Sequence, residues 1–417
     1  MARHPLKAFR PYFIGQTVSM LGDRITELAL PLTALSVLGA SAFEVAVLSA
    51  VLWVPAFFSV FVGAWVDRQP WRRRILITCD VGRACLLGLI PLFHILGSLS
   101  ILGLCLIAFG VGCCSVVFSA ASPSYFVSLV EQKDYVRATS LINGSGAVAY
   151  VVGPAAAGWL IAILTAPDAF TVDAASFLVS ACFIVRSRAY RKPQLDEEEG
   201  THQPLIIESM RALAMLARHP ILRPVLITTA SMNLANTAIL AILTTFLNRV
   251  MGFSASQIGV IFAIAGAGGV VGAVSANALT HRLRLGTVIS IAAIGFNLPF
   301  GVLFWMNGDR PVPGVVLGLI GAVAMFCVVM FDVLDNAVIL AAMDDRNRGK
   351  LVGAFTTVNY GIRPVGSILG GALVSLIGFN YSFLVLAVGG SLLASFLIFS
   401  RVSRLASIDE AHGNEPN

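Results

Sequence analysis

The fold of this chain is decided by residues 42–95, AFEVAVLSAVLWVPAFFSVFVGAWVDRQPWRRRILITCDVGRACLLGLIPLFHI. Two apolar runs, 42–66 and 75–95, flank a short basic segment. A membrane-spanning helix needs roughly 20 mostly apolar residues, and in segments of this kind only a helix satisfies its own backbone hydrogen bonds inside lipid. The stretch therefore predicts two transmembrane helices joined by a charged loop.

The rest of the 417-residue chain has the same character. It is 57% hydrophobic and only 12% charged, whereas soluble domains are about 25% charged. We therefore expect an all-α integral membrane protein with twelve transmembrane helices in two six-helix halves. The first apolar run carries charges and continues for a full span, so we expect a first helix there and not a cleavable signal. The twelve predicted spans are 12–37, 42–66, 75–95, 99–121, 139–163, 168–186, 224–247, 256–279, 285–306, 312–335, 351–377 and 380–400.

The placement of Lys and Arg predicts the orientation of these spans. Nearly all of the 28 basic residues fall in segments on one side, together with both termini, and only Arg249 and Arg310 fall in loops on the other. Basic loops stay cytoplasmic, so we expect both the N- and C-termini in the cytoplasm. The net charge of +6 is then explained by topology, and no nucleic-acid partner is expected.

Enzyme and metal sites find no support in the sequence. The seven cysteines lie in apolar stretches without a CxxC pair or a Cys/His spacing suited to zinc. The chain has neither a phosphate-binding GxxxxGK[ST] loop nor an HExxH motif. We therefore expect no enzyme activity, no cofactor and no bound nucleotide.

The chain divides near its middle. We expect an N-terminal half over 1–186, a cytoplasmic linker over 187–223, a C-terminal half over 224–404 and a polar tail over 405–417. The linker contains an amphipathic stretch, IIESMRALAMLARHP, which suits either a helix lying at the membrane surface or a solvated connector.

The two halves show signs of a parallel duplication. A shift of 210 residues aligns landmarks of the first half with landmarks of the second. The aligned pairs are Asp23 with Asn233, Asp67 with Asn277, Asp134 with Asp344, and Pro154 with Pro364.

Two motifs resemble those of a known family. The loop that runs from Gly63 through Asp67 to Arg74 closely resembles the loop signature of the major facilitator superfamily. The fifth span, with Gly144, Gly146, Gly153, Pro154 and Gly158, resembles the glycine-proline motif of its antiporter branch. The segments 16–31 and 123–137 also resemble the bacterial subgroup of macrolide-efflux and enterobactin-exporter proteins.

This resemblance implies a secondary transporter that works by alternating access, with a cytoplasmic gate at the loop. The residues assigned to the gate are Gly63, Asp67, Arg68, Arg72, Arg73, Arg74, Asp134 and Arg137. The second half departs from the pattern, because Asn277 replaces the loop aspartate and Arg363 stands where the fifth span has Gly153. The halves are therefore expected to differ in function.

The motifs also have a direct physical interpretation. Gly63 would allow two helices to approach, and Asp67 can accept charge-assisted hydrogen bonds from the neighbouring arginines; an ordinary basic loop is the alternative. In the fifth span, Gly153 and its small neighbours offer a flat face for helix packing, and Pro154 removes a backbone donor and bends the helix. Generic small-residue packing is the alternative there.

Ionisable residues inside the spans are costly in lipid and usually line a cavity. Beyond the first span, they are Asp173, Asp332, Asp335 and Arg363, while Asp80 and Arg83 are expected to form a local pair. Asn233 and Asn236 in the seventh span suit either cavity lining or contacts between helices.

The first span carries our candidates for proton coupling. Asp23 and Glu27 are four residues apart and therefore share a helix face, where two carboxylates cannot both ionise cheaply. Arg24 could hold Glu27 ionised, and Arg363 could pair with Asp23. A static salt-bridge network among these four residues is the alternative interpretation.

These observations favour proton-driven efflux of an amphipathic small molecule such as a drug, a macrolide-like compound or a siderophore. A proton-coupled importer of a small nutrient is the alternative, and a membrane enzyme or receptor has the least support. We expect the partners to be this substrate, protons and the lipid bilayer. We also expect a monomer in the bacterial inner membrane.

Overall fold

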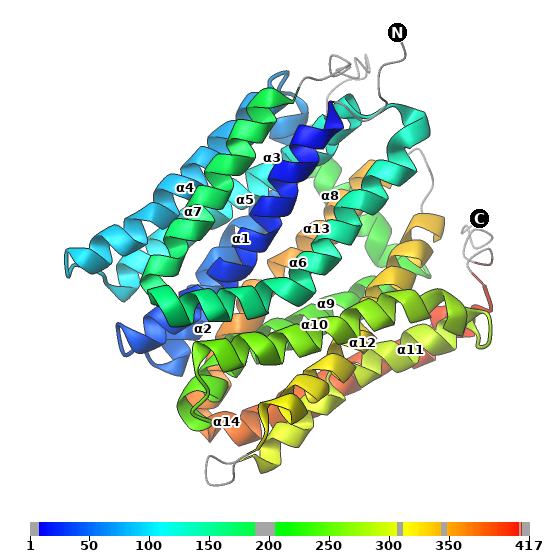
Figure 1. Ribbon diagram of the computed structural model, residues 1–417. Helices are drawn as coiled ribbons and strands as arrows, with labels where there is room; N and C mark the ends of the chain where they lie inside the picture. The colour runs from blue at the N-terminus through cyan, green and yellow to red at the C-terminus, as the bar shows by residue number, and fades with distance from the viewer. Residues whose placement is uncertain (1–7, 188–204, 307–311, 343–347, 408–409, 411–417) are drawn as a thin grey trace. The chain divides into compact units, whose positions relative to one another are not determined.

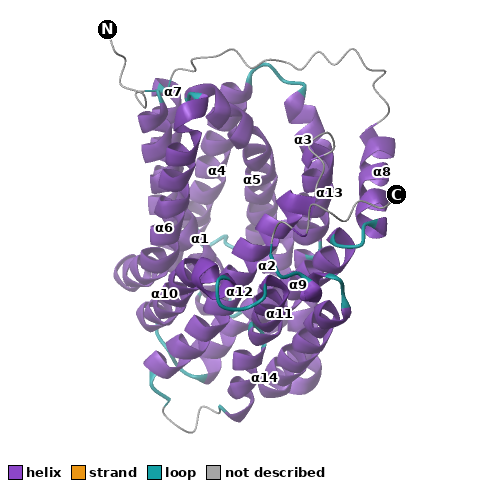
Figure 2. Ribbon diagram, turned by 90° about the vertical axis from the view of Figure 1, so that its right-hand side faces the viewer, coloured by secondary structure: helices purple, strands orange, loops and turns teal. Residues whose placement is uncertain are grey.

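The computed structural model describes residues 8–187, 205–306, 312–342, 348–407 and 410. Within these ranges all regular structure is helical and no strand occurs (Figure 2). This agrees with the all-α prediction. Long apolar runs leave the helix as the form that pairs every backbone group within its own segment.

The first part of the chain forms seven α-helices and two short 3₁₀ segments (Figure 1). They are α1 (Phe9–Ser36), α2 (Ala42–Trp53), η1 (Val54–Phe58), α3 (Ser59–Asp67), α4 (Arg72–Ile95), α5 (Ile101–Leu129), η2 (Gln132–Asp134), α6 (Tyr135–Leu164) and α7 (Ala166–Arg186).

The second part begins with α8 (Leu205–Arg218), which coincides with the amphipathic stretch of the linker. Its position at a membrane surface stays a prediction. The elements that follow are α9 (Leu222–Thr245), η3 (Phe246–Val250), α10 (Ala255–Thr280), α11 (Leu285–Gly295), η4 (Leu298–Trp305), α12 (Gly314–Ala342), α13 (Arg348–Gly361), α14 (Arg363–Ser395), η5 (Phe396–Phe399) and η6 (Val402–Arg404).

Ten helical segments of the described chain are long and apolar enough to cross a membrane. Helix α1 is not among them, because each of its 18-residue windows includes at least three charged residues. The predicted spans 351–377 and 380–400 fall within one segment, Gly353–Phe399. That segment is interrupted at Gly378, whose φ of 77° is not helical. The prediction of twelve spans therefore stays a prediction.

The described helices pack into two compact units. The first contains α1 and α3–α7, and the second contains α8–α14 together with the first part of α2, Ser41–Ala50. The division of α2 between units was not part of the domain boundaries that we predicted from sequence.

The same packing order recurs in both units. In the first, α1 packs on α7, α4 packs on α5 and α7, and α3 packs on α5. In the second, α9 packs on α14, α11 packs on α12 and α14, and α10 packs on α12. This correspondence is what a duplicated six-helix unit would give.

The turn that precedes the last long helix of each unit also recurs. Thr165, between α6 and α7, has φ 112°, and Gly378, inside α14, has φ 77°. The Thr165 hydroxyl accepts a hydrogen bond from the Asp168 backbone N–H and caps α7. Glycine adopts positive φ without steric cost, whereas threonine does not, so the cap accompanies a strained backbone in the first unit only.

Candidate functional site

Helices α1 and α7 approach each other closely at Gly22. A Cβ atom there would collide with Asp173 Oδ1 and Ser176 Oγ on α7. About two turns earlier, a Cβ on Gly15 would lie 3.1 Å from the Ser180 Cα atom. The two glycines of α1 therefore bring its backbone against the polar face of α7.

Asp173 is fully buried at this contact. It accepts a hydrogen bond from Thr26 Oγ1 of α1 through Oδ2 and another, 3.0 Å long, from Ser176 Oγ through Oδ1. Both carboxylate oxygens thus have a hydroxyl partner. The sequence indicated Asp173 as an ionisable residue but gave no sign that it belongs with α1.

Asp80 and Arg83 of α4 form an ion pair behind this contact. The prediction of a local pair is confirmed. Asp80 is fully buried and Arg83 is 5% exposed. The Arg83 guanidinium lies between two aromatic rings, 4.0 Å from the ring centre of Phe177 and 4.6 Å from that of Phe118. Such stacking stabilises a desolvated guanidinium.

Asp23 joins these residues from α1. Its side chain is half-buried and interacts electrostatically with Arg83 and Arg24. It also faces Asp173 closely enough for the two charges to repel. We call Asp23, Asp80, Arg83 and Asp173 the charged cluster. It holds three carboxyl groups around one guanidinium.

The expected grouping of Asp23 with Glu27 as proton-coupling residues stays a prediction, although the two side chains differ in exposure. Glu27 is 55% exposed in its side chain and accepts a hydrogen bond of 2.7 Å from Arg24 Nη1. Four residues advance a helix by about 400°, so Glu27 lies one turn further along and about 40° around from Asp23. That rotation is enough to take Glu27 out of the α1–α7 contact. The expected Arg24–Glu27 pair is confirmed.

The glycine-proline motif on α6 contacts α1 through Arg24. A Cβ on Gly153 would collide with Arg24 Cγ and lie 2.8 Å from its Cβ. The Arg24 guanidinium stands 5.0 Å from the ring centre of Tyr150, one turn before Gly153. Gly153 therefore makes room for the stem of Arg24 and not for a neighbouring helix backbone.

The other motif residues are less closely packed. A Cβ on Gly144 would meet no atom within 4 Å, and one on Gly146 would meet only Met20 Sδ, at 3.8 Å. Pro154 lies inside α6, and Gly158 is buried. The expected flat packing face is therefore limited to the region of Gly153 and Gly158.

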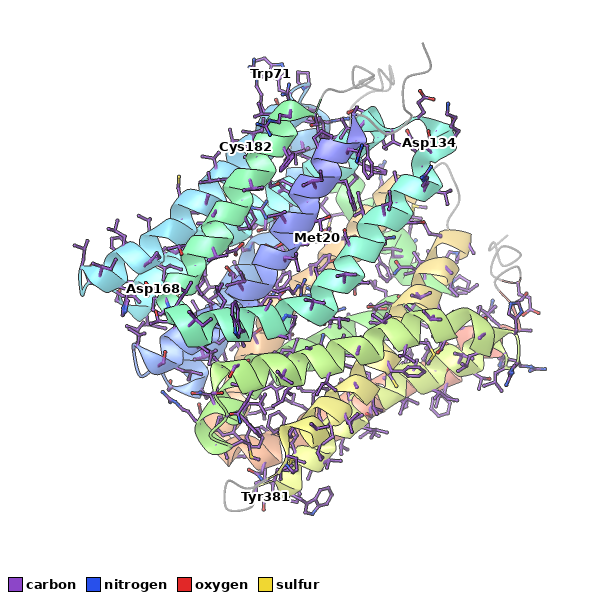
Figure 3. All side chains as sticks on the ribbon, in the orientation of Figure 1. Met20, Trp71, Asp134, Asp168, Cys182 and Tyr381 are labelled. Atoms are coloured by element: carbon purple, nitrogen blue, oxygen red, sulfur yellow. The ribbon has the colours of Figure 1, made fainter. Side chains whose placement is uncertain are left out.

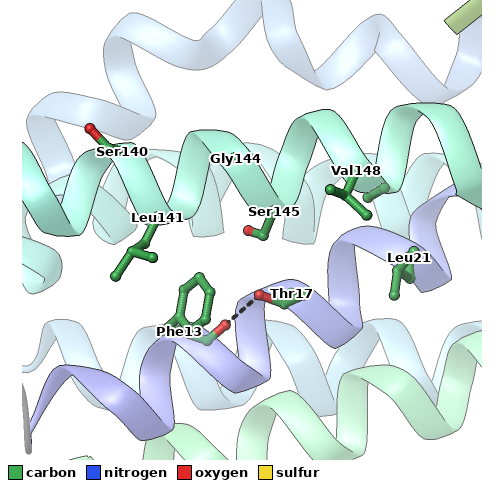
Figure 4. A pocket seen from close by; sticks show the side chains of 9 residues that line it. Phe13, Thr17, Leu21, Ser140, Leu141, Gly144, Ser145 and Val148 are labelled. Atoms are coloured by element: carbon green, nitrogen blue, oxygen red, sulfur yellow. Dashed lines mark hydrogen bonds between the residues drawn. The ribbon is translucent and has the colours of Figure 1, made fainter. Parts of the chain in front are cut away.

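A cavity of about 450 Å³ opens between α1 and α6 (Figure 4). Its polar groups are hydroxyls, and that of Thr17 already donates to the Phe13 carbonyl over 2.9 Å. The lining residues are Phe13, Thr17 and Leu21 of α1 and Ser140, Leu141, Gly144, Ser145, Val148 and Ala149 of α6. The cavity was not predicted from sequence, although Gly144, where the missing side chain leaves room, was named there.

The arginines of the gate loop have partners in the first unit. Arg73 donates from Nε to the Ile184 carbonyl over 3.1 Å, and from Nη2 to the Val185 carbonyl. These carbonyls end α7 and have no partner within the helix. Arg74 stacks 4.7 Å from the ring centre of Trp71. Arg73 therefore caps α7, a role that the sequence did not suggest.

Other predicted features of the gate are not seen in the first unit. A Cβ on Gly63 would meet no atom within 4 Å, so the expected close helix approach is absent there. The side chains of Asp67 and, in the second unit, Asn277 lie outside the described part of the structure. Arg68 follows the last residue of α3 and is exposed.

The second loop assigned to the gate lies at the same end of the first unit. Figure 3 shows Trp71 and Asp134 at this end and Asp168 at the opposite end. Asp134 precedes the first residue of α6 and is half-buried, while Arg137 is exposed. Lys133 pairs with Glu131 over 2.7 Å.

In the second unit, Arg363 binds Asn233. Its Nε donates to Asn233 Oδ1 over 3.1 Å, and its guanidinium stands 4.3 Å from the Tyr360 ring centre. Asp332 of α12 interacts electrostatically with the same arginine. The expected Arg363–Asp23 pair would join the two units and stays a prediction. Asn236 is half-buried.

Comparison with known protein families identifies the family that has this architecture. A family model of the Major Facilitator Superfamily matches residues 12–363. The chain belongs to the major facilitator superfamily. Membership makes it a multi-pass membrane transporter rather than an enzyme. A search of curated proteins finds no match.

Solved structures of other transporters have the same fold. The crystal structure of the nucleoside transporter NupG is 13% identical, covers 94% of this chain and 98% of its own, and superposes with a TM-score of 0.75. A bacterial homologue of the human lysosomal transporter Spinster, inward-facing and occupied, is 14% identical, covers 97% of this chain and 98% of its own, and superposes with a TM-score of 0.76. An inward-facing bacterial homologue of the iron transporter ferroportin is 15% identical, covers 96% of this chain and 100% of its own, and superposes with a TM-score of 0.72. At these identities the likeness extends to the fold alone.

Proposed function

We propose that this major facilitator protein exports an amphipathic small molecule in exchange for protons, by alternating access. The observation that carries the proposal is the charged cluster, with three carboxyl groups around one buried guanidinium. A charge inside a membrane protein is costly unless it is paired, and intramembrane carboxylates commonly form proton relays.

The charge balance of the cluster favours proton binding. Arg83 can neutralise one carboxylate, and Asp80 already forms the ion pair with it. Asp23 and Asp173 then face each other, and the other guanidinium near Asp23, that of Arg24, is already paired with Glu27. A proton shared between Asp23 and Asp173 removes their repulsion. We therefore assign coupling to Asp23 with Asp173, in place of Asp23 with Glu27.

The cavity between α1 and α6 suits the proposed cargo. Its walls are aliphatic and aromatic with a few hydroxyl groups, which is the usual character of sites for amphipathic ligands. It lies against α1, the helix that carries Asp23. Substrate and proton would therefore act on the same helix, as exchange requires. A drug, a macrolide-like compound or a siderophore fits this description.

The remaining features of the proposal follow from the sequence. We propose twelve spans with cytoplasmic termini, a monomer in the bacterial inner membrane, and a place in the macrolide-efflux and enterobactin-exporter subgroup. The loop from Gly63 to Arg74, with Asp134 and Arg137, is the proposed cytoplasmic gate. An Asp67→Asn variant should then insert and fold normally but transport more slowly. Asn233 and Asn236 are proposed to line the substrate path.

The test is transport in inverted membrane vesicles with an acidic lumen, using a panel of fluorescent amphipathic dyes, macrolides and siderophores. Export appears as uphill accumulation in the lumen, driven by the proton gradient. Asp23→Asn and Asp173→Asn should each abolish uphill accumulation but keep downhill exchange. Asp168→Asn, on the same helix but at its exposed end, is the matched control.

Two outcomes would overturn the proposal. Uphill accumulation that survives in both variants with unchanged pH dependence would remove the cluster from coupling. Accumulation in the wild type only when the proton gradient is reversed would indicate an importer of a small nutrient.

A further inference from the structure

A second buried carboxyl group lies in the other unit, on α12. Asp335 is 3% exposed, and its Oδ2 lies 3.1 Å from the Thr229 hydroxyl of α9. Its Oδ1 is buried and has no hydrogen-bond partner in the described part of the structure. An ionised carboxylate in this position would have one hydrogen bond and no counter-charge in contact.

The charged groups around Asp335 are few. Asp332 lies one turn earlier on the same helix, and Arg363 of α14 faces Asp332 while donating to Asn233. The elements α10, α11 and η4 pack on α12 and have no titratable side chain within their bounds. The described α9 has one, Arg223, which is exposed and lies in its first turn. Nothing basic in these elements therefore balances Asp335.

The hydrogen-bond geometry of Thr229 accommodates a proton on Asp335. The Thr229 Oγ1 atom lies 2.9 Å from the Val225 carbonyl oxygen and 3.1 Å from Asp335 Oδ2. A hydroxyl has a single hydrogen to donate, and a carbonyl oxygen can only accept. If Thr229 donates to Val225, the shorter of the two contacts, the contact with Asp335 is a hydrogen bond only when the carboxyl group is the donor.

A metal ion fits this site poorly. Oxygen-binding cations such as Ca²⁺ and Mg²⁺ take six or more ligands, whereas the described groups here are the two carboxyl oxygens and one hydroxyl. A proton needs only the oxygen that carries it and one acceptor. The geometry therefore suits a neutral carboxylic acid.

We propose that Asp335 and Thr229 form a second proton-binding site, separate from the charged cluster, with Asp332 as its exit. Asp332 is more exposed than Asp335 and one helical turn away, so it can take the proton that leaves Asp335. The O–H bond on Asp335 breaks and one forms on Asp332. The Thr229 hydroxyl then rotates from the Val225 carbonyl to the new Asp335 carboxylate, which keeps one hydrogen bond in either state.

The second proton-binding site differs from the charged cluster in what regulates the release of its proton. Arg363 faces Asp332, so any movement that takes Arg363 away from Asn233 changes the affinity of Asp332 for the proton from Asp335. The second unit would thus bind and release a proton according to the position of α14. This inference does not depend on the proposed substrate or on the direction of transport.

Infrared spectroscopy of the purified full-length protein tests the proposal without any substrate. The carbonyl stretch of a protonated carboxylic acid is recorded across the pH range in wild type, Asp335→Asn, Thr229→Val and Asp23→Asn. We expect Asp335→Asn to remove one protonated-acid band at neutral pH. Asp23→Asn should leave that band unchanged, and Thr229→Val should shift its frequency, because the acceptor of the acid hydrogen is lost.

Three results would overturn the proposal. An unchanged band in Asp335→Asn would mean that Asp335 is ionised and structural. A band that disappears when sodium is added would mean that the site holds a metal ion. If Asp335→Asn does not fold, the Thr229→Val variant decides. A protonated-acid band with the same frequency in Thr229→Val and in the wild type would show that Asp335 does not donate a proton to Thr229. Failure of dye transport with these infrared results intact would count against the proposed function alone.

Discussion

The two units place their charged residues on different helices although those helices pack in the same order. In the first unit, the charged cluster joins α1, α4 and α7. Its counterparts in the second unit are neutral, because Asn233 aligns with Asp23, and neither Leu285–Trp305 nor 379–399 contains a charged residue. The second unit instead carries Asp332 and Asp335 on α12 and Arg363 on α14. The packing order therefore does not dictate which helices carry the charges.

Two arginines, Arg24 and Arg363, show the difference most clearly. In the first unit, Arg24 belongs to α1 and its stem fills the space beside Gly153 of α6. In the second, Arg363 stands at the position of that glycine and reaches back to Asn233 of α9. The guanidinium has changed helices, and its hydrogen-bond partner on the first helix of the unit is an amide. The carboxylate that interacts with Arg363, Asp332, lies on α12 and not on the same helix as the arginine.

The largest expected effect concerns the guanidinium that exists only in the first unit. Arg83→Gln leaves Asp80 buried without its counter-charge, and removing one partner of a buried pair costs about 3–5 kcal/mol. We expect a large fall in thermal stability in detergent and low yield. The equivalent region of the second unit has no such pair, so its stability should not depend on a buried charge there.

The matched control for Arg83→Gln removes both charges. Asp80→Asn combined with Arg83→Gln should recover most of the lost stability, because Asp80 no longer leaves a buried charge without its partner. Thermal unfolding monitored by intrinsic fluorescence compares the variants. Equal losses in the single and double variants would show that the Arg83 contribution comes from its contacts with Phe118 and Phe177 and not from its charge.

A second comparison sets Gly366 of α14 against Gly153 of α6. A Cβ on Gly366 would collide with the Leu234 carbonyl oxygen, which is backbone and cannot move aside. A Cβ on Gly153 would collide with Arg24 Cγ and lie 2.8 Å from Arg24 Cβ, which is attached to the backbone of α1. We expect Gly366→Ala to lower stability by about 1–3 kcal/mol and Gly153→Ala to lower it less, because Arg24 Cγ can turn aside.

The effects on transport should have the opposite order: relative to the stability that each variant loses, Gly153→Ala should impair proton-driven transport more than Gly366→Ala. Gly153→Ala or Gly153→Leu displaces Arg24, which is next to Asp23, so coupling should weaken at normal expression. Parallel measurements of unfolding temperature and proton-driven dye accumulation check both effects. If Gly153→Ala destabilised the protein as much as Gly366→Ala, the distinction between a side-chain and a backbone contact would be lost.

The sequence was sufficient to predict the helical class, the family and the motif positions, because these follow from apolar length and short local patterns. It was sufficient for pairs close in sequence as well. Arg24 with Glu27 and Asp80 with Arg83 are each three residues apart on one helix, and both pairs are present. Helix geometry alone brings such residues together.

The sequence was insufficient where a contact depends on how helices pack against each other. Asp173 joins Asp23 because Gly22 lets α7 approach α1, and no local pattern reports that pairing. Arg73 was assigned to the gate, but the end of α7 lies within its reach. The difference in exposure between Asp23 and Glu27 has the same origin, since helical spacing fixes a residue's direction but not which neighbour it meets.

A smaller effect concerns the turn that the units share. Gly378 has a φ of 77° and a ψ of 171°, a conformation that costs a residue with a Cβ about 1–3 kcal/mol. Gly378→Ala should therefore lower thermal stability by about this amount. In the first unit, Thr165→Gly relieves the strain at φ 112° but removes the cap of α7, so the two changes should nearly cancel. Thermal unfolding measures both variants. A loss of stability in Gly378→Ala together with a gain in Thr165→Gly would sharpen the comparison, and a Gly378→Ala variant as stable as the wild type would contradict it.

The smallest expected effect separates Glu27 from Asp23 on the same helix. The Arg24–Glu27 pair is 25% and 55% exposed in its two side chains, and exposed pairs contribute about 0–1 kcal/mol. Glu27→Gln should therefore leave stability nearly unchanged. It should also leave proton-driven accumulation intact, because Glu27 lies outside the α1–α7 contact and does not face Asp173. Arg24 keeps its position through Gly153 and Tyr150, so the loss of its partner should not open the cluster. Dye accumulation at several pH values compares Glu27→Gln with Asp23→Asn in the same vesicles. If Glu27→Gln abolished uphill transport and Asp23→Asn did not, the coupling carboxylate would be the exposed residue of α1, and the buried cluster would be a static ion network.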